Sequence, residues 1–344
     1  MNVPAMMTRL AGLAWGLFLL WVDVAAAGAP APVPSAAGPH TPEHQVANLG
    51  DFRFEDGGVV KDFKVSYVTH GKLNRNKDNV VLVMQFFTGD HHNYDFLIGR
   101  GKALDPDRYF IVAPDFVGNA SLRHDLTTGP TNSGLKMGFP RYTIRDSVNV
   151  EYRLLKEYLG VDQVLAAAGA SIGAMKAYQL AVSYPSFVKG IVPITGSPAT
   201  SPMIRAMLRN LMEIIQLDAG WYGGNYEENP KTGLVTALKN FTPWLYTPQW
   251  FAANLKTPEQ HLAWERFWHE VFTVGAPQDA RDVYYQLRAW AEFNVGAGAG
   301  FKGDARAALG SIKAQALIVS AKDDLLVSRE EILQIGRASC RERV

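Results

Sequence analysis

The sequence predicts an α/β protein with a mostly parallel central sheet, helices on both faces of that sheet and a helical cap. Over residues 45–200, apolar runs with the character of strands alternate with helical stretches, as in a parallel sheet covered on both sides. Residues 201–303 instead contain helical stretches rich in Trp and Tyr, and a strand-like run resumes within residues 304–334. A helical insertion at that place is typical of a cap over a binding pocket.

Each expected element has its own signal. The run NVVLVMQFF at 79–87 is continuously apolar, as in a strand buried on both faces. In the helix expected at 143–160, Val148, Tyr152 and Leu155 share one face. Further strands are expected at 65–71, 109–116, 161–171, 188–196 and 313–324, the last one buried, and further helices at 172–185, 203–217, 258–272 and 280–293.

The composition is that of a globular enzyme. The chain has 344 residues, of which 47% are hydrophobic, and this is ample for a buried core. The formal net charge of +1 gives no bulk attraction to nucleic acid, so no nucleic-acid partner is expected. No cofactor is expected either.

The first 44 residues are expected to lie outside the fold. Residues 1–27 have a weakly basic start at Arg9, an apolar run and small residues of the A-x-A type, which is the layout of a secretory signal peptide. An uncleaved membrane anchor is the alternative, but the apolar run is short for a bilayer span. Residues 28–44, rich in Ala and Pro, are expected to be a flexible lead-in. The sequence thus predicts a secreted or periplasmic protein without stable membrane insertion after signal cleavage.

The strongest chemical signal is a G-x-S-x-G motif made by Gly169, Ser171 and Gly173. The motif stands between an apolar strand and a helix, where a tight turn with small neighbours holds a serine Oγ exposed at the carboxyl edge of the sheet. This context predicts that Ser171 is a nucleophile. The alternative is a structural turn whose serine only caps the helix.

A serine nucleophile needs a base and an orienting carboxylate, which follow it along the chain in the order Ser, Asp, His. Asp323 and Asp324 end the resumed strand, and Asp324 is chosen because of its D-x-x-V spacing, with Asp323 as the fallback. A solvated acidic turn is the alternative reading of this pair.

None of the eight histidines lies beyond Asp324. His91 and His92 adjoin the predicted site, but a base there would break the chain order. As a metal site the pair lacks a third ligand at a credible spacing. His261 and His269 fall in the cap. The predicted triad is therefore one residue short, and no metal ligand is assigned.

Specific sequence blocks follow one another from Asp51 to the region of Asp324. They are DFRFEDGGVVKDFKVSYVTHGKLNRNKDNVVLVMQFFTGDHH, GKALDPDRYFIV, FPRYTIRDSV, LGVDQVLAAAGASIGAMKAYQLAVSYPSFV and DAGWYGGNY. In this order they resemble the homoserine O-acetyltransferase family of α/β-hydrolases. The resemblance covers nearly all of the expected mature chain, and it implies the α/β-hydrolase fold.

The resemblance also implies roles for single residues. Ser171 would accept the acyl group, and Asp324 would orient the base. The backbone N–H groups of Phe87 and Ile172 would form an oxyanion hole, which stabilises the negative oxygen that develops when the acyl carbonyl is attacked. Phe87 stands in QFFTG where the family has HALTG, so the backbone role is kept while the side chains differ.

Two departures from the family argue against an amino-acid acceptor. Met212 falls where the transferases carry an arginine that holds the acceptor, and Arg209 or Arg205 would replace it only in another register. Export would also separate the protein from acetyl-CoA. Both points favour water or another alcohol as the acceptor, with unchanged acyl-enzyme chemistry.

Residues 335–344 are expected to be an artefact. One plausible set of codons for Ile335 to Val344 reproduces a common short-read sequencing adapter in frame, and the only cysteine, Cys340, lies within it. Natural sequence would then stop at about Leu333, leaving the second part of the core (304–334) incomplete and the histidine beyond the break. The chain as given is expected to be nearly inactive, because loss of the general base costs several orders of magnitude in rate.

The sequence therefore predicts acyl transfer through an ester of Ser171, most simply hydrolysis of a small-molecule ester. The first alternative is an acetyl-CoA-dependent homoserine or serine O-acetyltransferase. The second is a non-catalytic binding protein that keeps the fold. A homodimer is left open.

Overall fold

The computed structural model describes residues 43–119, 126–275, 277–298, 300–328 and 331. The expected signal peptide, all but the last two residues of the expected lead-in, and the expected adapter segment lie outside these residues. Within the described part of the chain, no helix combines the length and the apolar character that crossing a membrane would need.

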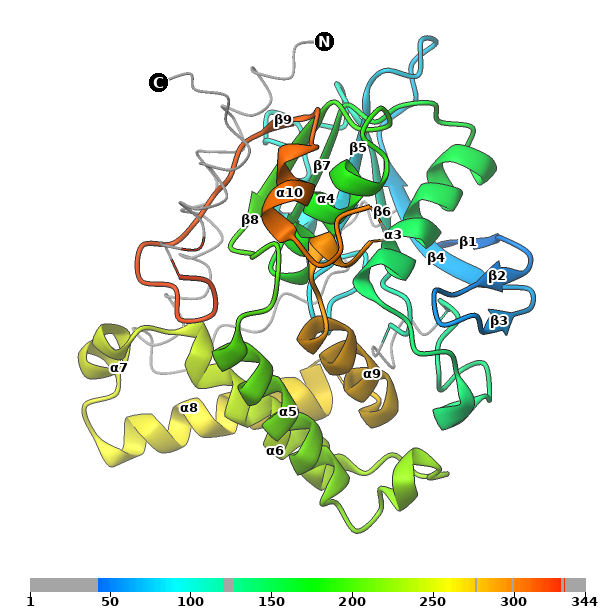
Figure 1. Cartoon of the computed structure of the whole chain (residues 1–344). Coiled ribbons are helices and arrows are strands. Elements are labelled where there is room, and N and C mark those ends of the chain that lie inside the picture. The colour runs from blue at the N-terminus through cyan, green and yellow to red at the C-terminus, as the bar shows by residue number, and fades with distance from the viewer. Residues whose placement is uncertain (1–42, 120–125, 276, 299, 329–330, 332–344) are drawn as a thin grey trace.

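A seven-stranded sheet lies at the centre of the molecule (Figure 1). Its strand order is β1-β4-β6-β5-β7-β8-β9, and all pairs from β6 to β9 are parallel, whereas β1–β4 and β4–β6 are antiparallel. The predicted mostly parallel sheet is thus confirmed. The strands are β1 (Gln45–Asn48), β4 (Lys64–His70), β5 (Val80–Met84), β6 (Phe110–Pro114), β7 (Ala166–Ala170), β8 (Gly190–Ile194) and β9 (Gln315–Ala316), and β2 (Phe52–Arg53) pairs with β3 (Val59–Val60) apart from them.

Both faces of the sheet are buried, as the continuous apolar run of β5 predicts. Side chains alternate across a strand, and here Val80, Leu82 and Met84 enter one core cluster whereas Val81 and Val83 enter another. Helices α3 (Ile144–Arg153), α4 (Ile172–Ser183) and α10 (Ala305–Gly310) belong to the first cluster. The segment around the short helix η2 (Asp95–Leu97) belongs to the second.

The chain between β8 and β9 is helical apart from its turns, and its main helices gather at one end of the sheet (Figure 1). Three of these helices begin at a Ser-Pro or Thr-Pro pair, with the proline at the first helical position. The side chain before each proline, Ser201, Thr247 or Thr257, accepts a hydrogen bond from a backbone N–H of the first turn. The helices are α5 (Pro202–Gln216), α6 (Lys231–Phe241), α7 (Pro248–Asn254), α8 (Pro258–Glu270) and α9 (Ala280–Ala291). The shorter helical turns of this region are η5 (Tyr222–Gly224), η6 (Thr242–Leu245), η7 (Val271–Gly275) and η8 (Val295–Ala297). Two others, η3 (Lys136–Gly138) and η4 (Leu154–Tyr158), precede β7.

The strand expected at 313–324 differs from the prediction, and the short strands β1 to β3 and the helices α6, α7 and α10 were not among the expected elements. β9 has only two residues, both exposed, although hydrogen bonds to β8 continue as far as Val319. Leu317, Ile318 and Val319 are only half-buried. The expectation of a buried strand was wrong, because β9 is the last strand of the sheet in the described residues and its outer edge faces no further strand.

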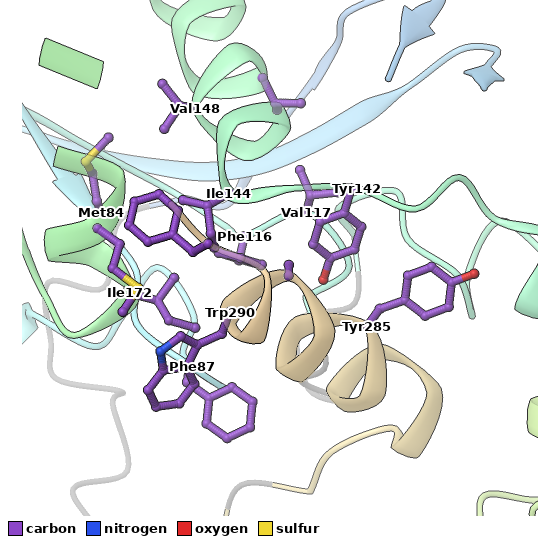
Figure 2. Packing of buried hydrophobic residues seen from close by; sticks show 14 of the residues in the cluster. Met84, Phe87, Phe116, Val117, Tyr142, Ile144, Val148, Ile172, Tyr285 and Trp290 are labelled. Atoms are coloured by element: carbon purple, nitrogen blue, oxygen red, sulfur yellow. The ribbon is translucent and has the colours of Figure 1, made fainter. Parts of the chain in front are cut away.

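The helical region and the sheet meet in a packed cluster of apolar side chains (Figure 2). Trp290 comes from α9, Ile172 from the start of α4, and Phe87 from the loop after β5. The rings of Phe87 and Trp290 have their centroids 5.7 Å apart. This packing fixes the loop after β5 against the turn that carries Ser171.

Candidate active site

Ser171 occupies the sharp turn between β7 and α4. Its backbone angles are φ 54° and ψ −120°, a conformation that non-glycine residues rarely adopt and that persists only when the surroundings enforce it. Its side chain makes no capping hydrogen bond to α4. Ser171 is therefore held in a strained turn at the N-cap position of α4, and its side chain does not cap the helix.

The two glycines of the motif are required by the close approach of this turn to β5. A Cβ atom on Gly173 would lie 2.2 Å from the carbonyl oxygen of Met84. A Cβ atom on Gly169 would lie 2.7 Å from that same oxygen. No side chain fits at either position, so the small residues of the motif have a direct steric cause.

Tyr94 ties the turn to the neighbouring strand. Its hydroxyl donates to the carbonyl oxygen of Met84 at 3.1 Å and accepts from the N–H of Ala170 at 2.8 Å. Burial raises the pKa of the Tyr94 phenol, which therefore stays protonated and able to donate. Sequence reasoning missed this residue, because its role depends on two partners on different strands, Met84 of β5 and Ala170 of β7.

Ser171 lines a cavity of about 390 Å³ between the sheet and the helices α6, α7 and α8. Phe87, Asp323 and Asp324 line the same cavity, so the structure brings together most of the predicted site residues. The remaining lining is mainly aromatic and aliphatic and includes Phe86, Phe96, Leu238, Phe241, Trp244, Leu245, Tyr246, Trp250, Trp268, Phe272, Leu325 and Leu326.

Of the two predicted oxyanion donors, Phe87 lines the cavity, whereas Ile172 begins α4 directly after Ser171. The side chain of Phe87 packs into the core against Trp290 (Figure 2) and against Phe241, so its backbone is the part that could serve a substrate. The next residue, Thr88, has a positive φ of 58° and donates its N–H to the Gln286 side chain at 3.0 Å. The N–H groups of Phe87 and Ile172 donate to no acceptor among the described residues.

Asp324 is held by its own turn. Its Oδ1 accepts from the N–H groups of Leu326 at 2.8 Å and Val327 at 3.1 Å. Burial raises the pKa of the Asp324 carboxyl, and these two backbone hydrogen bonds partly oppose that effect. Asp323, the fallback, lines the cavity but is exposed.

No histidine, lysine or arginine is among the described residues that line the cavity. Met212 packs against the core on α5, while Arg205 and Arg209 are exposed, and none of the three lines the cavity. The site as described can thus bind an apolar molecule beside a strained serine, but the described lining offers no cation for a carboxylate.

The chain belongs to the alpha/beta hydrolase fold family, which it matches over residues 79–343. It is 28% identical over 295 residues to the probable esterase of Corynebacterium glutamicum, covering 82% of this chain and 81% of that protein. It is also 37% identical over 209 residues to a homoserine O-acetyltransferase of Methanococcoides burtonii, but that match covers 55% of this chain and only 42% of the transferase.

The solved structure of the acetyl esterase MekB has a TM-score of 0.79 and 26% identity to this chain, and the match covers 88% of each. The fold class and the resemblance to homoserine O-acetyltransferases predicted from the sequence are confirmed. These relatives support ester hydrolysis or acyl transfer as the class of reaction.

Proposed function

We propose that this protein hydrolyses small apolar esters through an acyl-enzyme on Ser171. The observation that carries the proposal is the cavity. Ser171 lies there on a strained turn, aromatic side chains surround it, and its described lining contains no cationic side chain. Apolar pockets with few polar groups are the usual form of small-molecule sites.

The reaction would proceed in two halves. The Ser171 Oγ attacks the ester carbonyl carbon, its proton passes to an imidazole-type base, and the N–H groups of Phe87 and Ile172 stabilise the negative carbonyl oxygen. The carbon–oxygen bond to the alcohol then breaks, and the leaving alkoxide takes the proton from the base. Water attacks the acyl group on Ser171 in the second half, which releases the carboxylic acid and restores the serine.

Water is proposed as the acceptor because an amino-acid acceptor carries a carboxylate, which needs a cationic partner when it is buried. The described lining offers none. The second candidate is homoserine O-acetylation, which the 37% identity to such a transferase favours. Assaying acetyl-CoA with homoserine as the acceptor distinguishes the two candidates directly.

The proposal includes export, which rests on the signal-peptide pattern of residues 1–27. Expression of the gene in a Gram-negative host, followed by fractionation, should place the processed protein in the periplasm. Retention of unprocessed protein in the cytoplasm would contradict this part.

The nucleophile is tested by following acetylation of the protein by p-nitrophenyl acetate with mass spectrometry. None of the six histidines in the described part of the chain lines the cavity, so external imidazole is added as the base. One acetyl group is expected on the peptide that contains Ser171, with a rate that rises with imidazole concentration. The Ser171→Ala variant should lose this label.

Matched acidic variants test the carboxylate. Asp324→Asn should slow the imidazole-assisted acetylation by about tenfold or more, because the carboxylate orients and stabilises the imidazolium. Asp323→Asn, next to it on the same cavity, should leave the rate nearly unchanged. Equal labelling of Ser171→Ala and the unmodified protein would refute the proposed nucleophile and favour a binding protein.

A further inference from the structure

Three histidines from two distant segments converge beside the sheet. His44 precedes β1, whereas His91 and His92 follow β5. The Nε2 atom of His44 lies 2.9 Å from Nε2 of His92 and 3.3 Å from Nε2 of His91. One ligand nitrogen from each residue lies within 4.8 Å of the other two. His44 is the third histidine beside the pair, and the sequence alone did not place it there.

Two carboxylates orient the adjacent pair. Asp115 Oδ2 lies 2.9 Å from His91 Nδ1, and Asp95 Oδ2 lies 2.8 Å from His92 Nδ1. Such a carboxylate favours a proton on Nδ1 and so directs the Nε2 lone pair toward the centre of the cluster. Metal-binding histidines almost always have this kind of support on the other ring nitrogen.

The support is rigid as well as correctly placed. The side chains of His91 and Asp115 are both fully buried, and Asp115 also accepts from the backbone N–H of His91 at 2.8 Å. The fold thus fixes the ring position of His91, and Asp115 favours the tautomer with a proton on Nδ1 before any ligand arrives. A preorganised donor set of this kind is unlike a chance gathering of exposed side chains.

We propose that His44, His91 and His92 bind one divalent cation of the Zn²⁺ class. In a tetrahedral site with Zn–N distances of about 2.0–2.1 Å, ligand nitrogens are about 3.3 Å apart. The separation of the His44 and His91 nitrogens is 3.3 Å. Neutral imidazoles suit Zn²⁺ and its neighbours in the first transition row, whereas Mg²⁺ and Ca²⁺ prefer oxygen ligands. Water would complete the coordination.

The ion would act as a structural clamp. None of the three histidines lines the cavity, but the loop that carries His91 and His92 also carries Phe87 and Thr88. An ion bound here therefore ties the segment before β1 to the loop of the predicted oxyanion hole. This role does not depend on the identity of the ester.

The test uses full-length protein purified without a histidine tag, stripped with a chelator and reloaded with Zn²⁺ alone. Elemental analysis after gel filtration should give about one Zn²⁺ per chain, and loading should raise the melting temperature. Loading with Co²⁺ should give the visible absorption bands of a tetrahedral site. His44→Ala should lower the affinity for Zn²⁺ at least a hundredfold.

Two further variants keep the test decisive. Asp95 is partly exposed, so Asp95→Asn should fold, and it should weaken Zn²⁺ binding by about 10–100-fold through His92. The double variant His261→Ala, His269→Ala removes two exposed cap histidines and should bind Zn²⁺ normally. A reloaded protein without bound Zn²⁺, or unchanged binding in His44→Ala with circular dichroism like that of the unmodified protein, would overturn the proposal.

Discussion

A buried ion pair near the Ser171 turn offers the sharpest test of the packing. Lys176 lies on α4, five residues after Ser171, and its Nζ donates to Glu151 Oε1 of α3 at 2.7 Å. Both side chains are essentially inaccessible to solvent, at 0% and 1% exposure. The Lys176→Met substitution keeps most of the side-chain volume but leaves Glu151 as an uncompensated buried charge.

Breaking a buried pair in this way costs about 3–5 kcal/mol, because the remaining ion has lost its partner without regaining water. That is a large share of a typical unfolding free energy of about 5–15 kcal/mol. At about 2–4 °C per kcal/mol, the melting temperature should fall by on the order of 10 °C. Urea unfolding followed by tryptophan fluorescence measures the loss, and Lys189→Met, at an exposed position, is the matched control.

The stability that Lys176→Met loses should also depend on pH. Burial raises the pKa of Glu151 and the Lys176 ammonium opposes this, so removing Lys176 raises that pKa further. At pH values between the pKa of Glu151 in the unfolded chain and its higher pKa in the folded variant, the folded state binds more protons. The stability of Lys176→Met therefore falls as pH rises from about 4.5 through this range. The deficit of Lys176→Met should therefore be smaller at about pH 5 than at about pH 8. A deficit equal to that of Lys189→Met, or one that is the same at both pH values, would refute the reasoning.

Three further substitutions test the turn and its supports. Gly173→Ala should destabilise the fold by about 3 kcal/mol in thermal unfolding because its Cβ would overlap the Met84 oxygen, whereas Gly138→Ala, with open space around it, should change stability by less than about 0.5 kcal/mol. Tyr94→Phe should cost about 1–3 kcal/mol and slow acetylation of Ser171, since the part-buried N–H of Ala170 loses its acceptor; unchanged values for both would contradict this role. Gln286→Leu should cost a similar amount in urea unfolding, about 1–3 kcal/mol, because it removes the acceptor of the Thr88 N–H.

The parts predicted from the sequence are those that short segments specify. The five residues of β5 form an apolar run that is buried throughout. The glycines of the Ser171 turn are required by a distant contact, the Met84 carbonyl of β5, but the G-x-S-x-G pattern that contains them can be recognised within five residues. Both patterns are complete within about ten residues of chain, so each can be recognised without knowing its distant contacts.

The features that the sequence did not predict depend on which strands or side chains pack against an element in the folded protein. The run after residue 313 is apolar enough for a buried strand, but burial needs a neighbour on each side, and that is a property of the whole sheet. Tyr94, which lies in a loop, likewise gains its role only from partners on two strands, β5 and β7. Composition and spacing cannot encode such partners directly.

The loop after β5 shows how one short segment can serve two surfaces. Phe87, Thr88 and Asn93 line the cavity, while His91 and His92 between them point toward His44. A loop that only lined the cavity, or only carried the histidines, would need hydrogen bonds on one side alone. Here Gln286 of α9 holds the cavity side and Asp115 holds the histidine side, so the position of the Phe87 N–H is constrained from both directions. Preorganised donors are what an oxyanion hole requires, because donors that must reorient during the reaction stabilise its transition state less.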